Sequence, residues 1–558
     1  MKTFNFQLAI LFTAFFSISA FAQTDLLRDP QEDFISHGQN IDFSLIEDLP
    51  TQDHGRLKPL LTLVRETNLF ITGKYSMWGL NSGQLYMALL GFSDIDRLKV
   101  INVRHVGIRT ALKLERGQAY FSISDLDHTA LTDLTRPLME KEQQNKRSLE
   151  PDEKNLIEVF NQYWFLKNIS SGEHLRNAFD VEGINTKNEA AHGDVNSKVS
   201  LTAINYMKAL VSKDYVAASN MVGELRATIL NQKWPDKFEE ALPKMSREVF
   251  YNKSHIFFIT AVFYLLIGFA MIMGVPKFLV TGVYRYVFYS IPFLLLIAGF
   301  AIRVSITGFA PVTNMYGTML WVSFGITFFS LVILRLYNNL PLVGSLWIAA
   351  SGFLLTAESI PLVLSPDLDP IVAVLRSNLW LTIHVLTIVI SYAAFANAMI
   401  LGNIILVRTL INGDYNSQYV KDFAMSCYRM IQLGCFLITV GIILGGVWAD
   451  YSWGRFWGWD PKETWALIAD LGFLAVLHAK FVGWLSPFGI LASSTVAFLL
   501  VLMAWYGVNF ILAAGLHSYG FSSGGATIVG TFVSIQLIIL IVSLVIKNQR
   551  AKKMPTAN

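Results

Sequence analysis

The sequence contains little cysteine and little charge for its length. Only 2 Cys are present in 558 residues, Cys427 and Cys435, and they form no Cys-x-x-Cys pair, which argues against a thiol mechanism within this chain. Charged residues make up 15% of the chain and the net charge is +3, so nothing in the charge indicates nucleic acid as a partner. Hydrophobic residues make up 53%, too many for an ordinary soluble protein. Most of the chain is therefore predicted to lie in lipid.

The first 22 residues are typical of a secretory signal peptide. Lys2 precedes an apolar run from about residue 6 to residue 20, and Ala20-Phe21-Ala22 is a small-x-small cleavage site. An uncleaved anchor is the alternative, because the run is near the lower length limit for a membrane span. Either interpretation places the residues that follow outside the cytoplasm.

Residues 23–250 are rich in Asp, Glu, Lys and Asn, and they contain no run long enough to span a bilayer. This segment is predicted to be a soluble extracytoplasmic domain. Apolar residues recur at three- and four-residue spacing around residues 152–168 and 199–230, which predicts a mainly helical fold. The segment 55–59 precedes another such run and is either a functional loop or a plain turn. No catalytic constellation is recognisable in this domain.

The remainder, residues 251–550, is predicted to be an all-α polytopic transmembrane domain. Each apolar run is roughly 18 residues or longer, enough to cross a hydrocarbon core about 30 Å thick. Nine spans are expected, at about 256–274, 284–302, 318–335, 342–363, 380–407, 428–447, 464–482, 490–513 and 527–546.

Two arguments give the same orientation. An exported N-terminal domain starts the first span on the outer side, so nine crossings leave the C-terminus in the cytoplasm. Lys and Arg collect on the cytoplasmic side of short loops. The predicted inner segments carry Lys277, Arg285, Arg335, Arg408, Lys421, Arg429, Lys480, Lys547, Arg550, Lys552 and Lys553, and the outer ones carry Arg303, Arg376, Arg455 and Lys462. We expect an inner-membrane protein whose N-terminal domain is periplasmic.

A tryptophan-rich loop lies between two of these spans, on the predicted outer side. It contains Trp453, Trp457, Trp459 and Trp465, with Gly454 and Gly458 between them. Indole faces stack on flat conjugated ligands, and glycine lets the backbone approach such a ligand closely. Aromatic residues also form belts at membrane interfaces whatever the function. A belt spreads over many helix ends, however, so the concentration in one loop favours a binding site.

Two histidines flank this loop on the same predicted side. His384 lies about two turns into the fifth span, and His517 follows the outer end of the eighth. Two imidazoles beside an aromatic platform suit a six-coordinate haem iron, for which neutral imidazole is a common ligand. The alternative for each is a hydrogen-bonded polar residue that holds helices together.

Three separated segments, residues 377–392, 453–465 and 507–520, resemble the CcsA (System II) branch of the cytochrome c biogenesis proteins. That family handles haem and carries a Trp-rich (WWD) domain, and the resemblance extends over roughly residues 284–519. It implies that His384 and His517 are the axial ligands of an external haem. It also implies a haem platform made of Trp453, Gly454, Trp457, Gly458, Trp459 and Asp460.

Three further residues have competing roles. Asp460, before Pro461 and Glu463, is expected mainly to cap the seventh span, with haem contact a weaker hypothesis. His478 lies deeper in that span, and the resemblance implies a second, transmembrane haem site there. No other predicted span has a histidine at that depth, so a ResB (CcsB)-type subunit supplies the second ligand or the iron is five-coordinate. Arg303 either pairs with a haem propionate or anchors a helix end at the headgroups.

The resulting interpretation is a subunit that transports or presents haem b and attaches it covalently to apocytochrome c at the outer face of the membrane. This is the activity of a holocytochrome c synthase, or haem lyase. The reactive thiols belong to the Cys-x-x-Cys-His motif of the substrate, which thiol-reducing proteins keep available. The alternatives are a haem chaperone or exporter that does not catalyse attachment, and a transporter of another aromatic solute.

Overall fold

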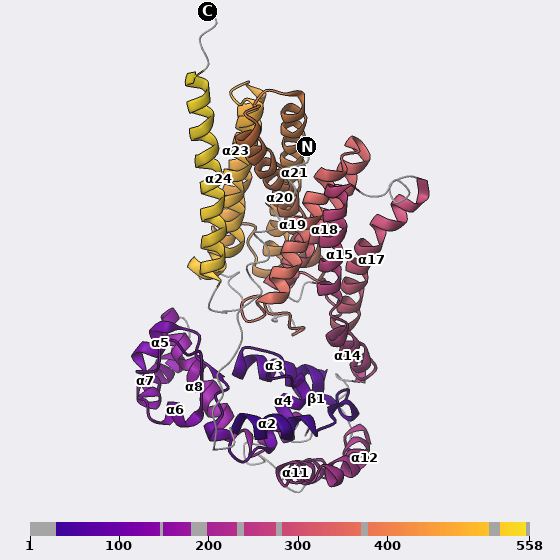
Figure 1. Ribbon diagram of the computed structural model, residues 1–558, viewed down its shortest axis with the longest axis vertical. Coiled ribbons are helices and arrows are strands. Elements are labelled where there is room, and N and C mark those ends of the chain that lie inside the picture. The colour runs from indigo at the N-terminus through magenta and orange to yellow at the C-terminus, as the bar shows by residue number, and fades with distance from the viewer. Residues whose placement is uncertain are drawn as a thin grey trace, which may run out of the picture.

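The computed structural model describes residues 30–144, 149–179, 198–231, 239–274, 282–369, 378–512 and 525–553. The predicted signal peptide and His517 lie outside the described residues. Long, nearly parallel helices form one part of the molecule, and shorter helices with two small two-stranded sheets gather below one end of that bundle (Figure 1).

The part nearer the N-terminus is helical with minor strands. The helices predicted around residues 152–168 and 199–230 are present, the second divided in two by a short turn. The elements are α2 (Pro30–Gln39), η2 (Phe43–Leu45), β1 (Pro50–Asp53), β2 (Arg56–Pro59), α3 (Leu60–Thr72), α4 (Ser82–Gly91), η3 (Ile95–Arg97), β3 (Ile101–Asn102), α5 (Val106–Ala111), β4 (Tyr120–Phe121), α6 (Ile123–Asp127), α7 (Leu131–Gln144), α8 (Pro151–Ile169), α9 (Glu173–Phe179), α11 (Lys198–Val211) and α12 (Tyr215–Asn231).

The segment expected as a turn or functional loop is one arm of a β-hairpin. Strands β1 and β2 pair antiparallel, with Pro50 opposite Pro59 and Asp53 opposite Arg56. The two connecting residues, His54 and Gly55, both have positive φ, 47° and 77°. Positive φ at both central residues is the geometry of tight hairpin turns that match the strand twist, and glycine adopts it without strain.

The described residues include nine helical segments long and apolar enough to cross a membrane, which confirms the predicted number. The elements are η6 (Leu242–Lys244), α14 (Met245–Ser254), α15 (Ile256–Met273), α17 (Gly282–Thr307), α18 (Met315–Tyr337), α19 (Leu340–Ser359), α20 (Asn378–Asn412), α21 (Gln418–Trp453), α22 (Pro461–Phe481), α23 (Pro487–Leu502), η8 (Met503–Leu512, a π-helix) and α24 (Ala526–Lys553).

Several predicted boundaries are wrong; the sixth span, expected over 428–447, is the longer helix α21 (Gln418–Trp453). The span expected over 342–363 ends at Ser359, because a helix rarely continues into the residue before a proline, here Pro361. The span expected over 284–302 continues to Thr307, so Arg303 lies inside α17 and not in the loop after it.

Ionic contacts join the hairpin to the first membrane helix. The guanidinium of Arg56 donates to both carboxylate oxygens of Glu248, at 2.9 and 2.8 Å, and the hydroxyl of Thr62 donates to the same carboxylate at 2.8 Å. Glu248 belongs to α14, which meets α15 at His255, and only 1% of it is exposed. Arg56 also lies 3.6 Å from Asp369, in the segment after α19. The hairpin is thereby tied to two parts of the membrane bundle.

Replacing Glu248 by Ala should loosen this junction. Removing one partner of a buried ion pair costs about 3–5 kcal/mol, and the remaining contact with Asp369 favours the lower value. Amide hydrogen exchange in residues 50–59 should therefore become roughly a hundredfold faster. The double variant Arg56→Met/Glu248→Met removes both members of the buried pair and leaves the exposed Asp369 without its arginine, so it should recover most of the protection. Wild-type exchange rates in Glu248→Ala would contradict the assigned role.

Candidate functional site: an aromatic cavity with a histidine

A cavity of about 230 Å³ lies at one end of the bundle, lined by α18 and the residues before it, α20, α21, the tryptophan-rich loop, α22 and η8. Its walls are mainly apolar and aromatic, with a few polar groups, as is usual for sites that hold a small organic ligand or cofactor. The lining residues include His384, Trp448, Phe456, Trp457, Lys462, Glu463, Trp505 and Asn509.

The cavity lies at the same end of the bundle as the hairpin. Asn314, which lines it, donates through its side-chain amide to the carbonyl of Ser365 at 2.9 Å. The segment after α19 then continues to Asp369, which contacts Arg56 of the hairpin at 3.6 Å. One short segment therefore contacts both a wall of the cavity and the N-terminal part.

His384 projects from α20 into the wall of the cavity. Its Nδ1 lies 2.8 Å from the carbonyl oxygen of Gly441 on α21. A carbonyl oxygen only accepts hydrogen bonds, so Nδ1 carries the proton and the lone pair of the neutral ring is on Nε2. The imidazole plane is within 9° of the Trp448 ring plane, with centroids 6.4 Å apart. This backbone contact and the parallel ring fix the orientation of the imidazole.

Glycines on α21 make room for these rings. A Cβ atom on Gly445 would lie 2.5 Å from Cε1 of His384, and one on Gly446 would lie 2.5 Å from the Phe456 ring. Sequence reasoning did not find these positions. The signal was present in the four-residue spacing of Gly441 and Gly445, since small residues at that spacing let membrane helices approach closely.

The tryptophans of the loop do not share one surface. Trp457 lines the cavity, while Trp459 is 71% exposed and its ring is perpendicular to that of Trp457 at 5.7 Å. Trp453 ends α21 and meets Trp448 edge-on at 4.7 Å, before Gly454 reverses the chain with φ of 69°. The tryptophans of the predicted platform thus divide into one that lines the cavity, one that packs against the cavity-lining Trp448, and one exposed indole.

A carboxylate organises the loop. Glu463 Oε2 accepts from the backbone N–H groups of Gly458 at 2.8 Å and Asp460 at 3.3 Å, and Oε1 lies 3.3 Å from the Arg455 guanidinium. The Asp460 side chain accepts from the N–H of Lys462, and Asp460 and Glu463 together form a capping box, which confirms the predicted helix start. The sequence predicted the cap, but not the additional hydrogen bond from the Gly458 N–H to Glu463.

Lys462 is a cavity-lining residue that sequence reasoning did not single out. Its Nζ donates to Oδ1 of Asn509 at 3.0 Å. Asn509 lies in η8, and π-helical turns are frequent at functional sites. Sequence periodicity does not distinguish a π-helical turn from a continued α-helix, so this feature required the structure.

Two other predicted site residues lie away from the cavity lining. Arg303 is only 4% exposed, donating to the Tyr251 hydroxyl at 2.7 Å and the Pro366 carbonyl at 3.0 Å. It is not among the residues that line the cavity. His478 is exposed in the last turn of α22, where its Nδ1 is 2.8 Å from the Leu474 carbonyl.

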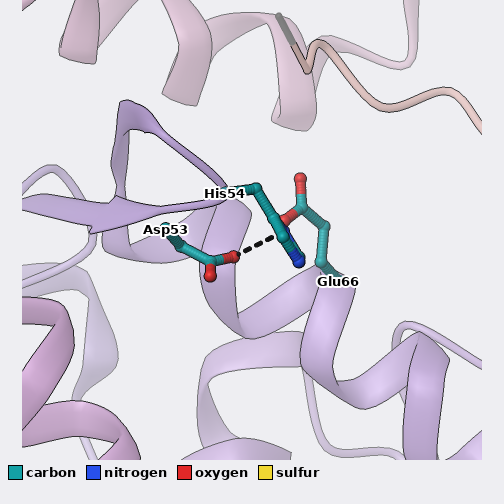
Figure 2. A group of neighbouring side chains, drawn as sticks. All are labelled: Asp53, His54 and Glu66. Carbon is teal, nitrogen blue, oxygen red and sulfur yellow. Dashed lines mark ion pairs between the residues drawn. The ribbon is translucent and has the colours of Figure 1, made fainter. Parts of the chain in front are cut away.

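A possible metal cluster occurs at the hairpin, where Asp53 and His54 come close to Glu66 of α3 (Figure 2). The ammonium of Lys58, which is fully buried, bonds to Glu66 and lies 2.6 Å from Asp53. Burial alone lowers the pKa of Lys58, but the two carboxylates outweigh it and hold that pKa above its usual range. The carboxylates therefore already have a cation between them, and we assign this cluster a structural role.

The fit between Gly445 and His384 can be tested with one methyl group. Gly445→Ala should displace the imidazole, because the new Cβ would meet it at 2.5 Å, at a cost of about 1–3 kcal/mol. Gly530→Ala on α24 is a matched control, since nothing lies within 4 Å of its added Cβ. Thermal unfolding of the purified variants should show a lower midpoint for Gly445→Ala alone; equal midpoints would argue against the close approach.

Fold and cavity together define a polytopic helical membrane protein with an aromatic, histidine-bearing cavity at one end. Residues 312–517 match the cytochrome c assembly protein family. The cytochrome c biogenesis protein CcsA of Prochlorococcus marinus (strain MIT 9312) is 36% identical over 252 residues, covering 40% of this chain and 80% of that protein. CcsA of Guillardia theta is 34% identical over 241 residues, covering 38% of this chain and 78% of that protein.

Similarity to one relative extends beyond the membrane helices. The protein NrfI of Wolinella succinogenes is 27% identical over 537 residues, which covers 90% of this chain and 57% of NrfI. The chain belongs to the cytochrome c assembly protein family, through its match to the family and its coverage of the CcsA proteins.

Proposed function

We propose that this protein presents haem b in the aromatic cavity and promotes its covalent attachment to apocytochrome c. Membership of the family gives the chain a role in cytochrome c biogenesis. The observation that carries the finer proposal is a membrane cavity lined by indole rings, in which a histidine is held by its Nδ1.

The residues of the cavity suit a haem. Aromatic and aliphatic walls favour the macrocycle over water, and Trp457 offers an aromatic surface from the loop. His384 holds its proton on Nδ1, so its Nε2 has the lone pair that an axial ligand donates. We propose His517 as the second axial ligand. Bound haem would supply the vinyl groups to which thiols add.

We propose that the protein's own contribution is to hold the haem in a fixed position for reaction with the thiols. Glu463 fixes the backbone of the loop, and the loop holds Trp457 against the cavity. Holding two reactants in a fixed geometry removes much of the entropy cost of a bimolecular step. The thiols come from the Cys-x-x-Cys-His motif of an exported apocytochrome, since Cys427 and Cys435 are both buried in α21.

The route of haem and the topology are part of this proposal. We propose that residues 1–22 are a signal peptide, that residues 23–250 form a periplasmic domain, and that the cavity opens to the same side. His478 would belong to a second haem site on the path outward. Its exposed position on α22 leaves space for a ligand from a ResB (CcsB)-type subunit.

Spectroscopy tests the ligands. The purified protein should carry low-spin, six-coordinate haem, and His384→Ala or His517→Ala should lose that signature because one axial position is vacated. Added imidazole should restore it in part. His478→Ala is the matched control, which should reduce haem per protein without changing the spectrum of the haem that remains. Undiminished low-spin haem in the His384→Ala/His517→Ala double variant would refute the ligand assignment.

Attachment is tested in a bacterial host that lacks its own cytochrome c maturation genes. Co-expression with an exported apocytochrome should yield haem that stays on the cytochrome through denaturing electrophoresis. The same apocytochrome with both motif cysteines replaced by Ser should yield none. Bound haem without any covalent product would favour a chaperone or exporter, and a protein without haem would favour transport of another aromatic solute.

A further inference from the structure

Two charged side chains occur among the described residues that line the cavity, and they are partnered differently. Glu463 faces the loop with both oxygens engaged, by the Gly458 and Asp460 amides and by Arg455. Its charge is therefore compensated by groups of the loop. Lys462, the neighbouring residue in sequence, is the other charged side chain of the lining.

Lys462 has a neutral partner. Its Nζ donates to Oδ1 of Asn509 at 3.0 Å, and among the described residues no carboxylate oxygen comes within 4 Å of it. The amide of Asn509 is itself oriented, because its Nδ2 donates to the Trp505 carbonyl at 3.0 Å. The oxygen of Asn509 is thus directed at the ammonium by a contact on the other side of the amide.

An ammonium in such a wall is expected to take an anionic ligand. The hydrogen-bond partner of this partly desolvated cation is a neutral amide oxygen, and the Asp460 carboxylate acts on it only from beyond ion-pair distance. A carboxylate on a ligand could therefore still add a short, charge-assisted hydrogen bond. Arg303 does not compete for this role, because its guanidinium contacts Tyr251 and Pro366 outside the cavity lining.

We propose that Lys462, oriented by Asn509, is the counter-ion of a carboxylate on the bound ligand. The inference rests on the proposed function, under which that carboxylate is a haem propionate. Lys462 then determines which way round the macrocycle enters the cavity and selects porphyrins with free carboxylates over their esters. It acts as a positioning and specificity residue, with no part in bond formation.

The test compares haem with its dimethyl ester in wild type and in Lys462→Met, by titration in one detergent. The dissociation-constant ratio of ester to haem is the readout, because detergent partition of each ligand cancels when ratios are compared between variants. A charge-assisted hydrogen bond contributes enough for wild type to prefer free haem by about tenfold to a hundredfold. In Lys462→Met that preference should fall to near unity, and Lys462→Arg should keep most of it.

The controls separate this role from a structural one. Lys480→Met removes a lysine from the far end of the same helix, outside the cavity lining, and should leave the ratio at the wild-type value. A Lys462→Met protein that binds haem through His384 with an unchanged ratio refutes the inference and leaves the proposed function standing. A wild-type protein that binds neither porphyrin refutes both. If Lys462→Met does not fold, Asn509→Leu is measured in its place and should also lower the ratio of ester to haem dissociation constants. An unchanged ratio in Asn509→Leu refutes the inference.

Discussion

The close packing of α20 against α21 is the constraint on which the cavity depends. Gly434, Gly441 and Gly445 lie on α21 where side chains of α20 approach, and a Cβ on any of them would come within 2.6 Å of those side chains. Lipid offers no hydrophobic force between helices, so such contacts rely on small residues that allow backbones to approach. The same approach brings the Gly441 carbonyl to His384, so packing and imidazole orientation have one cause.

Charged residues have separate tasks in the two parts of the molecule. Arg56 and Lys58 of the hairpin are largely or fully buried and are paired with carboxylates, Arg56 with Glu248 of α14 and Lys58 with Glu66 of α3. Arg303 likewise joins α17 to Tyr251 and to the carbonyl of Pro366. Around the cavity, Glu463 holds a loop, while the ammonium of Lys462 faces the space with an amide as its partner. Its place in the cavity lining is what distinguishes Lys462 from these structural cations.

The segment between α19 and α20 links the two parts. It accepts hydrogen bonds from Asn314 and Arg303 through the carbonyls of Ser365 and Pro366, and Asp369 reaches Arg56. Asn314 also caps α18 by accepting from Gly317 N–H. The hairpin is therefore connected to one wall of the cavity by a short series of ionic, covalent and hydrogen-bonded links. A movement of the hairpin could reach the bound ligand through these links.

The sequence by itself determined the class of protein, the number of spans and the start of α22. These depend on local properties: long apolar runs, and the Asp-Pro-x-Glu order that caps a helix. The tertiary structure alone decided that Trp457 faces the cavity while Trp459 faces outward, that Arg303 is used elsewhere, and that Lys462 meets Asn509. Those facts depend on which helix faces which, and on a π-helical turn in η8. Such contacts form between residues that are far apart in the chain, so the hydropathy and spacing of a local segment cannot predict them.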